Sequence, residues 1–306
     1  MRKVLKRVKK ALVNPRYILI YFIDKPYINR FIPDKAFLKI KYRLVMGEKL
    51  DLKEPQTYNA KLQWLKLYNR SDDMTMMADK YAVRKYVADT IGEEYLIPLI
   101  GVWDSVDEID FDSLPNQFAM KCNHTSGNGV VICKDKSKLD IEKTKKELKK
   151  AMKMDYSLQN REWHYKNIKR KIIAEKYMVD ESGTQLKDYK FFCFDGEVKA
   201  MFVATDRGVD TRFDFYDSDF NHLNMLNGHE NAVNPISKPC GFDKMKALAE
   251  KLSVGLPHAR IDFYDINGKV YFGEVTFYHW SGFTPFEPKE WDYTFGSWIT
   301  LPSENI

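Results

Sequence analysis

Apolar positions recur along this chain with two periods, and the period changes repeatedly between residues 57 and 276. Spacings of three and four residues are typical of amphipathic helices, and they predict helices at 57–68, 77–87, 140–154 and 242–252. Asp140 is the candidate N-cap of the third. Runs rich in β-branched and aromatic residues predict strands, at 96–103, 117–123, 130–133, 171–179, 186–194 and 197–204, with two more in 259–276. This mixture, with no repeat or long linker, predicts an α+β fold with boundaries near residues 55 and 115.

Length and composition limit the number of domains and argue against zinc-binding, membrane-spanning and disulfide-rich proteins. With 306 residues the chain can form one large or two medium domains. Six histidines are scattered without a zinc-binding pattern. No apolar run reaches the about 18 residues that a membrane span needs. The four cysteines show neither CxxC spacing nor a disulfide framework, which is typical of a reducing cytosol; they are Cys122, Cys133, Cys193 and Cys240.

The net charge of +6 is concentrated at the start of the chain. Residues 1–13 predict a basic amphipathic helix that ends at Asn14-Pro15. Such a helix can lie on an anionic membrane surface, or it can be a solvated helix docked on the main domain. Nucleic-acid binding is disfavoured because no recognised motif accompanies the charge. The basic residues are Arg2, Lys3, Lys6, Arg7, Lys9 and Lys10.

Residues 259–276 read as two strands joined at Asn267-Gly268, a strong hairpin signal. Alternation places Arg260 and Asp262 on one face of the first strand, and Glu274 and Thr276 on one face of the second. Two carboxylates beside an arginine can hold Mg²⁺ against a polyphosphate, because hard oxygen atoms bind the metal while the cation meets the phosphate. An ordinary hairpin with solvated charges is the alternative.

The strand register decides whether the two carboxylates meet. A two-residue turn would pair Asp262 with Gly273 and send Glu274 to the other face. A three-residue loop, Asn267-Gly268-Lys269, with one residue in the left-handed region and a bulge, would pair Asp262 with Glu274 and Arg260 with Thr276. We favour the bulged loop.

Three further stretches carry candidate chemistry. In residues 120–129, small residues and glycines allow backbone N–H groups to close over phosphate oxygens, and Lys121 adds a point charge. Residues 174–178 end a strand and offer a backbone edge to a purine. Lys190 shares a strand face with Asp188 and can reach the same phosphates. The alternative for the first stretch is a simple hairpin, for the second an ordinary edge strand, and for the third a solvated charge pair. The candidate phosphate-binding loop residues of the first stretch are Ser126, Gly127 and Gly129.

The order of these stretches resembles the ATP-grasp superfamily, and within it the teichuronopeptide-biosynthesis (TupA-like) branch. The resemblance covers most of the chain from about residue 55, in the stretches ADKYAVRKYV at 78–87, EEYLIPLIGVWDSVDEIDFDSLPNQFAMKCNH at 93–124, IIAEKYM at 172–178, LKDYKFFCFDGE at 186–197 and RIDFYDINGKVYFGEVTFY at 260–278. It implies two α+β subdomains that enclose ATP and Mg²⁺. It also implies a basic N-terminal segment at 1–55, a pre-ATP-grasp-like region at 56–115 and a catalytic region at 116–306.

The resemblance implies a role for each matching residue. It places Lys80 and Lys121 on the phosphates, and Glu175 with the backbone of Met178 at the adenine. It places Lys190 and Arg260 on phosphate or acyl phosphate, and Asp262 and Glu274 on the metal. One position departs from the pattern: Thr276 stands where many of these ligases have Asn, so a complete second metal site is in doubt. His279 and residues 281–284 follow where related ligases shape the acceptor pocket, although a structural role for His279 is the alternative.

The implied reaction joins a carboxylate to an amine through an acyl phosphate, with ATP and Mg²⁺ as cofactors, in the cytoplasm or on the inner face of the membrane. The implied partners are a carboxylate-bearing glycan or amino acid and an amine acceptor of polysaccharide biosynthesis. Two alternatives remain. A glycosyltransferase would use a metal motif such as Asp217-Ser218-Asp219, which reads better as a solvated turn, and a non-catalytic membrane-surface scaffold would not need the lysines and carboxylates.

Overall fold

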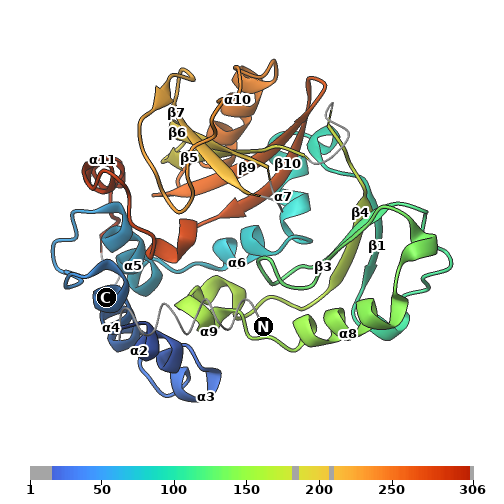
Figure 1. The fold of residues 1–306 in the computed structure, drawn as a ribbon, viewed down its shortest axis with the longest axis horizontal. Coiled ribbons are helices and arrows are strands. Elements are labelled where there is room, and N and C mark those ends of the chain that lie inside the picture. Colours follow the sequence, from blue (N-terminus) through green and yellow to red (C-terminus); the bar gives the residue numbers. More distant parts are fainter. Residues whose placement is uncertain (1–15, 181–185, 207–209, 304–306) are drawn as a thin grey trace. The chain divides into compact units, whose positions relative to one another are not determined.

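The computed structural model describes residues 16–180, 186–206 and 210–303 (Figure 1). The described chain divides into two compact units. Unit 1 takes residues from 16–70, 157–163 and 278–303, and unit 2 takes residues from 71–156 and 164–277. These limits do not coincide with the boundaries expected near 55 and 115, because the C-terminal segment returns to the unit that contains the N-terminal helices. The α+β prediction is confirmed.

Unit 1 is helical, and its core forms where two helices approach closely. Thr57 caps α5 by accepting a hydrogen bond from the backbone N–H of Ala60 at 3.2 Å, which confirms the helix predicted from residue 57. A Cβ at Gly296 would lie 2.2 Å from a backbone oxygen of Gln56, so only glycine permits this approach. The helices are α2 (Arg16–Ile23), α3 (Pro26–Asn29), α4 (Asp34–Met46), α5 (Tyr58–Tyr68), α9 (Ser157–Asn160), η5 (His279–Gly282) and α11 (Glu290–Trp298).

Unit 2 contains two antiparallel sheets, and the smaller one is sheet A. Its strand order is β1-β4-β2-β3. One face of sheet A packs on α8 (Ile141–Met152), whose N-cap is Asp140 as predicted. The strands are β1 (Leu99–Trp103), β2 (Phe118–Cys122), β3 (Val130–Cys133) and β4 (Ile172–Lys176), with short helices η1 (Glu93–Tyr95), η2 (Val106–Glu108), η3 (Lys136–Lys138) and η4 (Trp163–Tyr165) in the connections.

Sheet B has six strands in the order β10-β9-β5-β6-β7-β8. One of its faces is covered by α10 (Phe242–Leu252), which has the bounds that the sequence predicted. The rings of Phe191 and Phe242 meet there with centroids 5.9 Å apart. The strands are β5 (Asp188–Phe194), β6 (Glu197–Thr205), β7 (Arg212–Asp217), β8 (His222–Leu223), β9 (Ala259–Ile266) and β10 (Lys269–Thr276).

The single helix expected over residues 77–87 is wrong. The structure has two helices there, α6 (Asp72–Ala78) and α7 (Val83–Thr90). Asp79 separates them, because its carboxylate accepts hydrogen bonds from the backbone N–H groups of Tyr81 and Ala82 at 2.8 and 3.2 Å. Asx side chains compete with the helical backbone in this way. The break exposes the backbone of Lys80 to other partners.

The basic helix expected at residues 1–13 lies outside the described residues. In the part of the chain that the structure describes, no helix combines the length and the apolar character needed to cross a bilayer. The described chain begins with the apolar helix α2.

Candidate active site

Sheet A has one face in the core and one face that carries charge. Met120 is fully buried in the core, so its neighbours Ala119 and Lys121 point to the opposite face. Glu175 on β4 pairs directly with Ala119 and therefore shares that face. The Nζ atom of Lys121 lies 2.7 Å from a carboxylate oxygen of Glu175. The structure thus brings together two residues that the resemblance assigns to nucleotide binding.

A second cation holds the same carboxylate, and the sequence did not reveal it. Nη1 of Arg84 on α7 lies 3.2 Å from Glu175, and Nη2 donates to the backbone oxygen of Ile97 at 3.0 Å. Glu175 is therefore held from two sides by Arg84 and Lys121. No periodicity marks Arg84 in the sequence, because its role depends on a contact 91 residues away.

The charged face of sheet A also carries apolar side chains. Val130 pairs with Lys121, and Ile132 pairs with Ala119. Their side chains are 46% and 52% exposed, although they belong to a strand. An exposed apolar surface beside Lys121 is suited to the flat face of a purine. This exposed apolar surface could not be predicted from the sequence, because all four residues of β3 are apolar and show no alternation.

Lys80 lies in the break between α6 and α7. Its backbone N–H donates to the oxygen of Asn123 at 3.2 Å, and its Nζ donates to the oxygen of Thr125 at 2.6 Å. Asn123 in turn donates to Asp79 at 2.8 Å. These contacts hold Lys80 against the loop after β2. Burial lowers the pKa of Lys80, Lys121 lowers it further, and Glu274 raises it.

The loop that contains Ser126, Gly127 and Gly129 is exposed and tightly turned. Gly127 and Gly129 have φ values of 72° and 66°, which favour glycine. A Cβ at Gly129 would lie 2.5 Å from Cβ of Ala151, whereas one at Gly127 would meet nothing within 4 Å. Gly129 is thus required by packing, and the space beside Gly127 leaves room for a ligand. Met178 lies two residues beyond the end of β4 and is half-buried.

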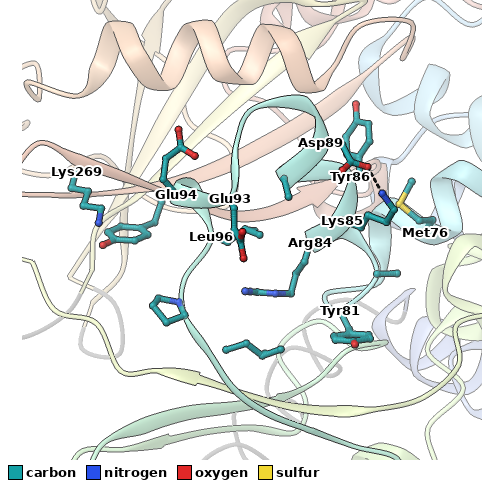
Figure 2. A pocket seen from close by; sticks show the side chains of 15 residues that line it. Met76, Tyr81, Arg84, Lys85, Tyr86, Asp89, Glu93, Glu94, Leu96 and Lys269 are labelled. Carbon is teal, nitrogen blue, oxygen red and sulfur yellow. Dashed lines mark hydrogen bonds and ion pairs between the residues drawn. The ribbon is translucent and has the colours of Figure 1, made fainter.

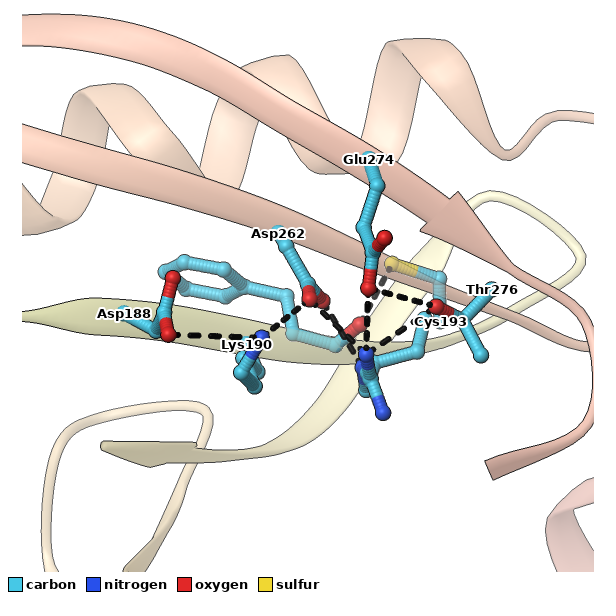
Figure 3. A network of polar contacts seen from close by, with 8 residues as sticks. Asp188, Lys190, Cys193, Asp262, Glu274 and Thr276 are labelled. Atoms are coloured by element: carbon cyan, nitrogen blue, oxygen red, sulfur yellow. Dashed lines mark hydrogen bonds and ion pairs between the residues drawn. The ribbon is translucent and has the colours of Figure 1, made fainter. Parts of the chain in front are cut away.

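Sheet B carries a continuous network of charges on one face (Figure 3). Arg260 donates from Nε and Nη2 to the two oxygens of Asp262 at 2.7 and 2.8 Å, a bidentate pair. The same Nη2 lies 3.2 Å from Glu274 and 3.0 Å from the hydroxyl of Thr276. Lys190 on β5 donates to Asp262 as well.

Lys190 connects a third carboxylate to this network. Its Nζ lies 3.8 Å from Asp188, two residues away on the same face of β5, as the alternation predicted. The side chain of Asp188 is almost completely buried. The network thus contains three carboxylates and two cations, which leaves it one negative charge in excess.

The hairpin brings Asp262 and Glu274 together by a route that differs from the expected one. The predicted pairings of Asp262 with Glu274 and of Arg260 with Thr276 are confirmed. The three-residue loop is wrong, because Lys269 pairs with Ile266 across a two-residue turn. Asn267 and Gly268 have φ values of 53° and 84°, as a type I′ turn requires.

The change of register lies instead at Gly273, between Phe272 and Glu274. This bulge moves Glu274 to the face of Asp262. A Cβ at Gly273 would lie 3.0 Å from the backbone oxygen of Asp262, so the strands approach closely at this point. The bulge, and not the turn, therefore assembles the two carboxylates.

The two carboxylates respond differently to the same surroundings. Burial would raise the pKa of Glu274, but Lys80, Lys190, Arg260 and Lys121 outweigh burial and lower this pKa to about 2. Burial raises the pKa of Asp262, and Arg260 and Lys190 offset this only in part. Lys80 and Lys121 are thus among the charges that keep the pKa of Glu274 low.

The oxygen donors of this site fit Mg²⁺. Asp262 and Glu274 supply carboxylates and Thr276 supplies a hydroxyl, all hard ligands. Among the described residues, no group of three or more His, Cys, Asp or Glu side chains is arranged to hold a metal by itself. Mg²⁺ is usually held by one or two carboxylates together with phosphate oxygens and water. The donor set therefore fits a metal that binds together with a polyphosphate.

A cavity of about 1300 Å³ opens beside α7 and η1 (Figure 2). Tyr81, Tyr86 and Tyr271 line it, and Arg84 points into it. None of the residues expected to bind phosphate or metal lines this cavity. Arg84 connects it with the site, because the same side chain binds Glu175.

Two other stretches singled out in the sequence lie elsewhere. His279 is 2% exposed and belongs to unit 1. Asp217 accepts hydrogen bonds from the backbone N–H groups of Asp219 and Asn221 at 2.9 and 2.8 Å, so its carboxylate stabilises a turn. This geometry agrees with a solvated turn at residues 217–219.

Solved structures similar to this chain include ligases. The D-alanine–D-alanine ligase of Bacillus anthracis is 18% identical, with 66% of this chain and 57% of that chain covered and a TM-score of 0.38. That of Helicobacter pylori is 14% identical, with 80% and 69% covered and a TM-score of 0.43. The ATP-grasp ligase PsnB is 13% identical, with 79% and 62% covered and a TM-score of 0.37. The chain thus spans little more than half the length of the first of these.

No curated protein matches the chain. The model of one family does, described as TupA-like ATPgrasp, and the match runs over residues 60–300. It includes both sheets and every site residue described above. The chain therefore belongs to the TupA-like ATP-grasp family.

Proposed function

We propose that this protein is an ATP- and Mg²⁺-dependent ligase that joins a carboxylate to an amine through an acyl phosphate. One observation carries the proposal. Arg260 on β9 contacts both Asp262 and Glu274, which pair across the hairpin. Lys190 on β5 contacts Asp262, and the cations around Glu274 lower its pKa. Cations from several elements thus surround a carboxylate that can bind a metal. A nucleoside triphosphate placed there would contact both the cations and the bound metal.

The proposed nucleotide position follows from the face of sheet A. The adenine would lie against Val130 and Ile132, with Glu175 and the backbone of Met178 at its polar edge. Lys80, Lys121 and the loop at 126–129 would bind the phosphates. Lys121 would exchange part of its pairing with Glu175 for the phosphate charge.

The proposed chemistry uses sheet B. A substrate carboxylate oxygen would attack the γ-phosphorus, and ADP would leave. The amine nitrogen would then attack the acyl carbon, phosphate would leave, and the amine proton would pass to solvent. Lys190 and Arg260 would stabilise the charge that spreads over the phosphoryl oxygens. Mg²⁺, held by Asp262, Glu274 and Thr276, would supply further neutralisation of phosphate charge.

We propose a cytoplasmic reaction, where ATP is available, and a substrate from surface-polysaccharide biosynthesis. The carboxylate would be a uronic acid or an amino acid, and the acceptor would be an amino acid or an amino sugar. The support for this class is the resemblance to the teichuronopeptide branch.

The direct test is to identify the products. Purified full-length protein would be incubated with ATP, Mg²⁺, a mixture of uronic acids and amino acids, and hydroxylamine. We expect ADP, phosphate and a carboxylate-dependent hydroxamate, because hydroxylamine traps the acyl phosphate. Formation of AMP and pyrophosphate would contradict the proposed reaction.

Nucleotide binding can be tested separately from turnover. Lys121→Met and Lys190→Met should each weaken ATP binding about tenfold in isothermal titration, because each removes a cation from the phosphates. Lys138→Met is the matched control, since the side chain of Lys138 is 82% exposed on η3. Unchanged ATP affinity in both site variants would refute the assigned nucleotide site.

A further inference from the structure

The first helices of the described chain expose large apolar side chains. Six of these side chains, listed below, form what we call the α2–α3 patch. It makes up six of the fifteen exposed large apolar residues in the described structure, although it spans only residues 18–31. The members are Ile18, Leu19, Tyr21, Phe22, Tyr27 and Phe31, with exposures of 45%, 54%, 51%, 49%, 59% and 74%. Patches of this kind mark interaction surfaces.

The burial pattern of α3 is inverted. Its polar residue Asn29 is 1% exposed and donates to the backbone oxygen of Leu158 at 2.8 Å. Arg161 donates to the backbone oxygen of Asn29, also at 2.8 Å. The nearby Tyr27 and Phe31 face outward. The helix is thus fixed to unit 1 through polar groups while its aromatic side chains remain exposed, the opposite of a water-facing helix.

Cations accompany the exposed rings. Nζ of Lys25 lies 3.8 Å from the ring centroid of Tyr21, and Cζ of Arg30 lies 4.7 Å from that of Phe31. Asp24 forms an ion pair with Lys41 at 2.6 Å, so its charge is compensated within unit 1. The patch therefore presents apolar and cationic groups together.

The net charge of the chain is distributed unevenly between residues 1–33, which include the patch, and the remaining residues. Residues 1–33 contain nine Lys or Arg and one acidic residue, Asp24. The full chain contains 49 Lys or Arg and 43 Asp or Glu, so the remaining residues contain 40 and 42. The entire excess of positive charge thus lies in the segment that carries the patch.

We propose that the α2–α3 patch docks the protein on the surface of an anionic lipid bilayer. Aromatic rings prefer the level of the lipid headgroups, aliphatic side chains enter the acyl boundary, and cations meet anionic headgroups. The eight residues of α2 span only about 12 Å, so the helix lies in the plane of the surface. Ile20 and Ile23 are half-buried, whereas the exposed apolar side chains of α2 are Ile18, Leu19, Tyr21 and Phe22. This inference does not depend on the proposed reaction.

The test uses full-length protein and vesicle sedimentation. Vesicles of phosphatidylcholine alone are compared with vesicles that also contain phosphatidylglycerol. We expect binding to the anionic vesicles, and we expect Phe22→Ser with Phe31→Ser to weaken it at least about tenfold. Val233→Ser with Tyr293→Ser is the matched control, since these side chains are 92% and 50% exposed outside the patch. Thermal unfolding checks that each variant is folded.

A variant lacking residues 1–13 separates the two parts of the segment. We expect weaker binding than in the full chain, because six cations are removed, and a further loss when Phe22 and Phe31 are also replaced. Equal binding with and without the patch substitutions would overturn the proposal. So would equal binding to neutral and anionic vesicles, or a dimer in vesicle-free solution that the patch substitutions dissociate.

Discussion

Two lysines, one in each unit, have opposite surroundings. Lys66 in unit 1 is fully buried and donates to Gln63 Oε1 at 3.0 Å and to the backbone oxygens of Asn160 and Ser281 at 2.9 and 2.8 Å. Lys190 in unit 2 retains 13% side-chain exposure and contacts the carboxylates Asp262 and Asp188. Lys66 thus meets neutral oxygens, whereas Lys190 meets charges.

The contacts of Lys66 hold a strained turn. Trp280, Ser281 and Gly282 have φ values of 48°, 55° and 62°. Gln63 donates to the backbone oxygen of Gly282 at 2.7 Å, next to the contact between Lys66 and Ser281. A left-handed backbone at residues other than glycine costs free energy and persists only when its surroundings hold it. Lys66 and Gln63 supply that support.

The comparison distinguishes an anchor from a binding site. A buried cation that donates to backbone oxygens fixes a chain segment, because removing the cation takes a donor from each of those oxygens. A cation within an excess of carboxylates can exchange partners when a metal and phosphates bind. Substitutions should therefore change stability around Lys66 and activity around Lys190.

The largest effect should follow Asp262→Asn. This change preserves shape but removes a charged metal ligand, so we expect Mg²⁺-dependent turnover to fall about 100-fold or more. Thermal unfolding should change far less. Asp243→Asn is the control, since Asp243 lies on α10 with 82% side-chain exposure. Full activity of Asp262→Asn would remove the distinction between the two regions.

The next effect is on stability. Lys66→Met keeps the volume but removes a donor from three oxygen acceptors, of which only the backbone oxygen of Ser281 keeps a second donor among the described residues, Gln63 Nε2 at 3.0 Å. The free energy of unfolding should therefore fall by about 3 kcal/mol. Turnover per folded molecule should change by less than about twofold, because the contacts of Lys66 stabilise the turn and take no part in the reaction. Lys39→Met, an exposed change on α4, is the control for denaturant unfolding. Lost turnover at unchanged stability would instead place Lys66 in the active site.

The protonation of Lys66 provides a pH-dependent test of the same contacts. Burial lowers the pKa of Lys66 to about 7 from 10.5, with Glu162 raising it and Lys41 lowering it. Between these values the unfolded chain binds more protons than the folded chain, so the contribution of Lys66 to stability increases as pH rises from about 7 toward 10. The unfolding free energy of the wild type minus that of Lys66→Met should therefore increase over this interval. A difference that is constant with pH would contradict the lowered pKa.

The smallest effect should follow Arg84→Met. Arg84 is a positioning residue that acts through Glu175, and Lys121 still pairs with that carboxylate. We expect KM for ATP to rise about fivefold with kcat nearly unchanged, the loss of one charged hydrogen bond. Lys85→Met on the same helix, with 82% side-chain exposure, is the control. A fall in kcat without a change in KM would show that Arg84 does not act through nucleotide binding.

Local patterns in the sequence determined most of the elements and part of the site. Alternation placed Arg260 with Asp262 and Lys190 with Asp188, because neighbouring side chains in a strand point to opposite faces. Asn267-Gly268 identified the turn, and Asp140 identified a helix start, because caps and turns depend on a few adjacent residues. The family resemblance, which the match over residues 60–300 confirmed, rested on the same local stretches.

Only the tertiary structure decided how these elements meet. It placed the bulge at Gly273 and not in the turn, divided residues 77–87 at Asp79, and brought Arg84 to Glu175. It also separated the exposed Val130 and Ile132 from the core face of a strand whose residues are all apolar. These outcomes depend on contacts between residues far apart in the chain, whereas turns, caps and alternation depend on the geometry of consecutive residues, and only the latter can be read from the sequence.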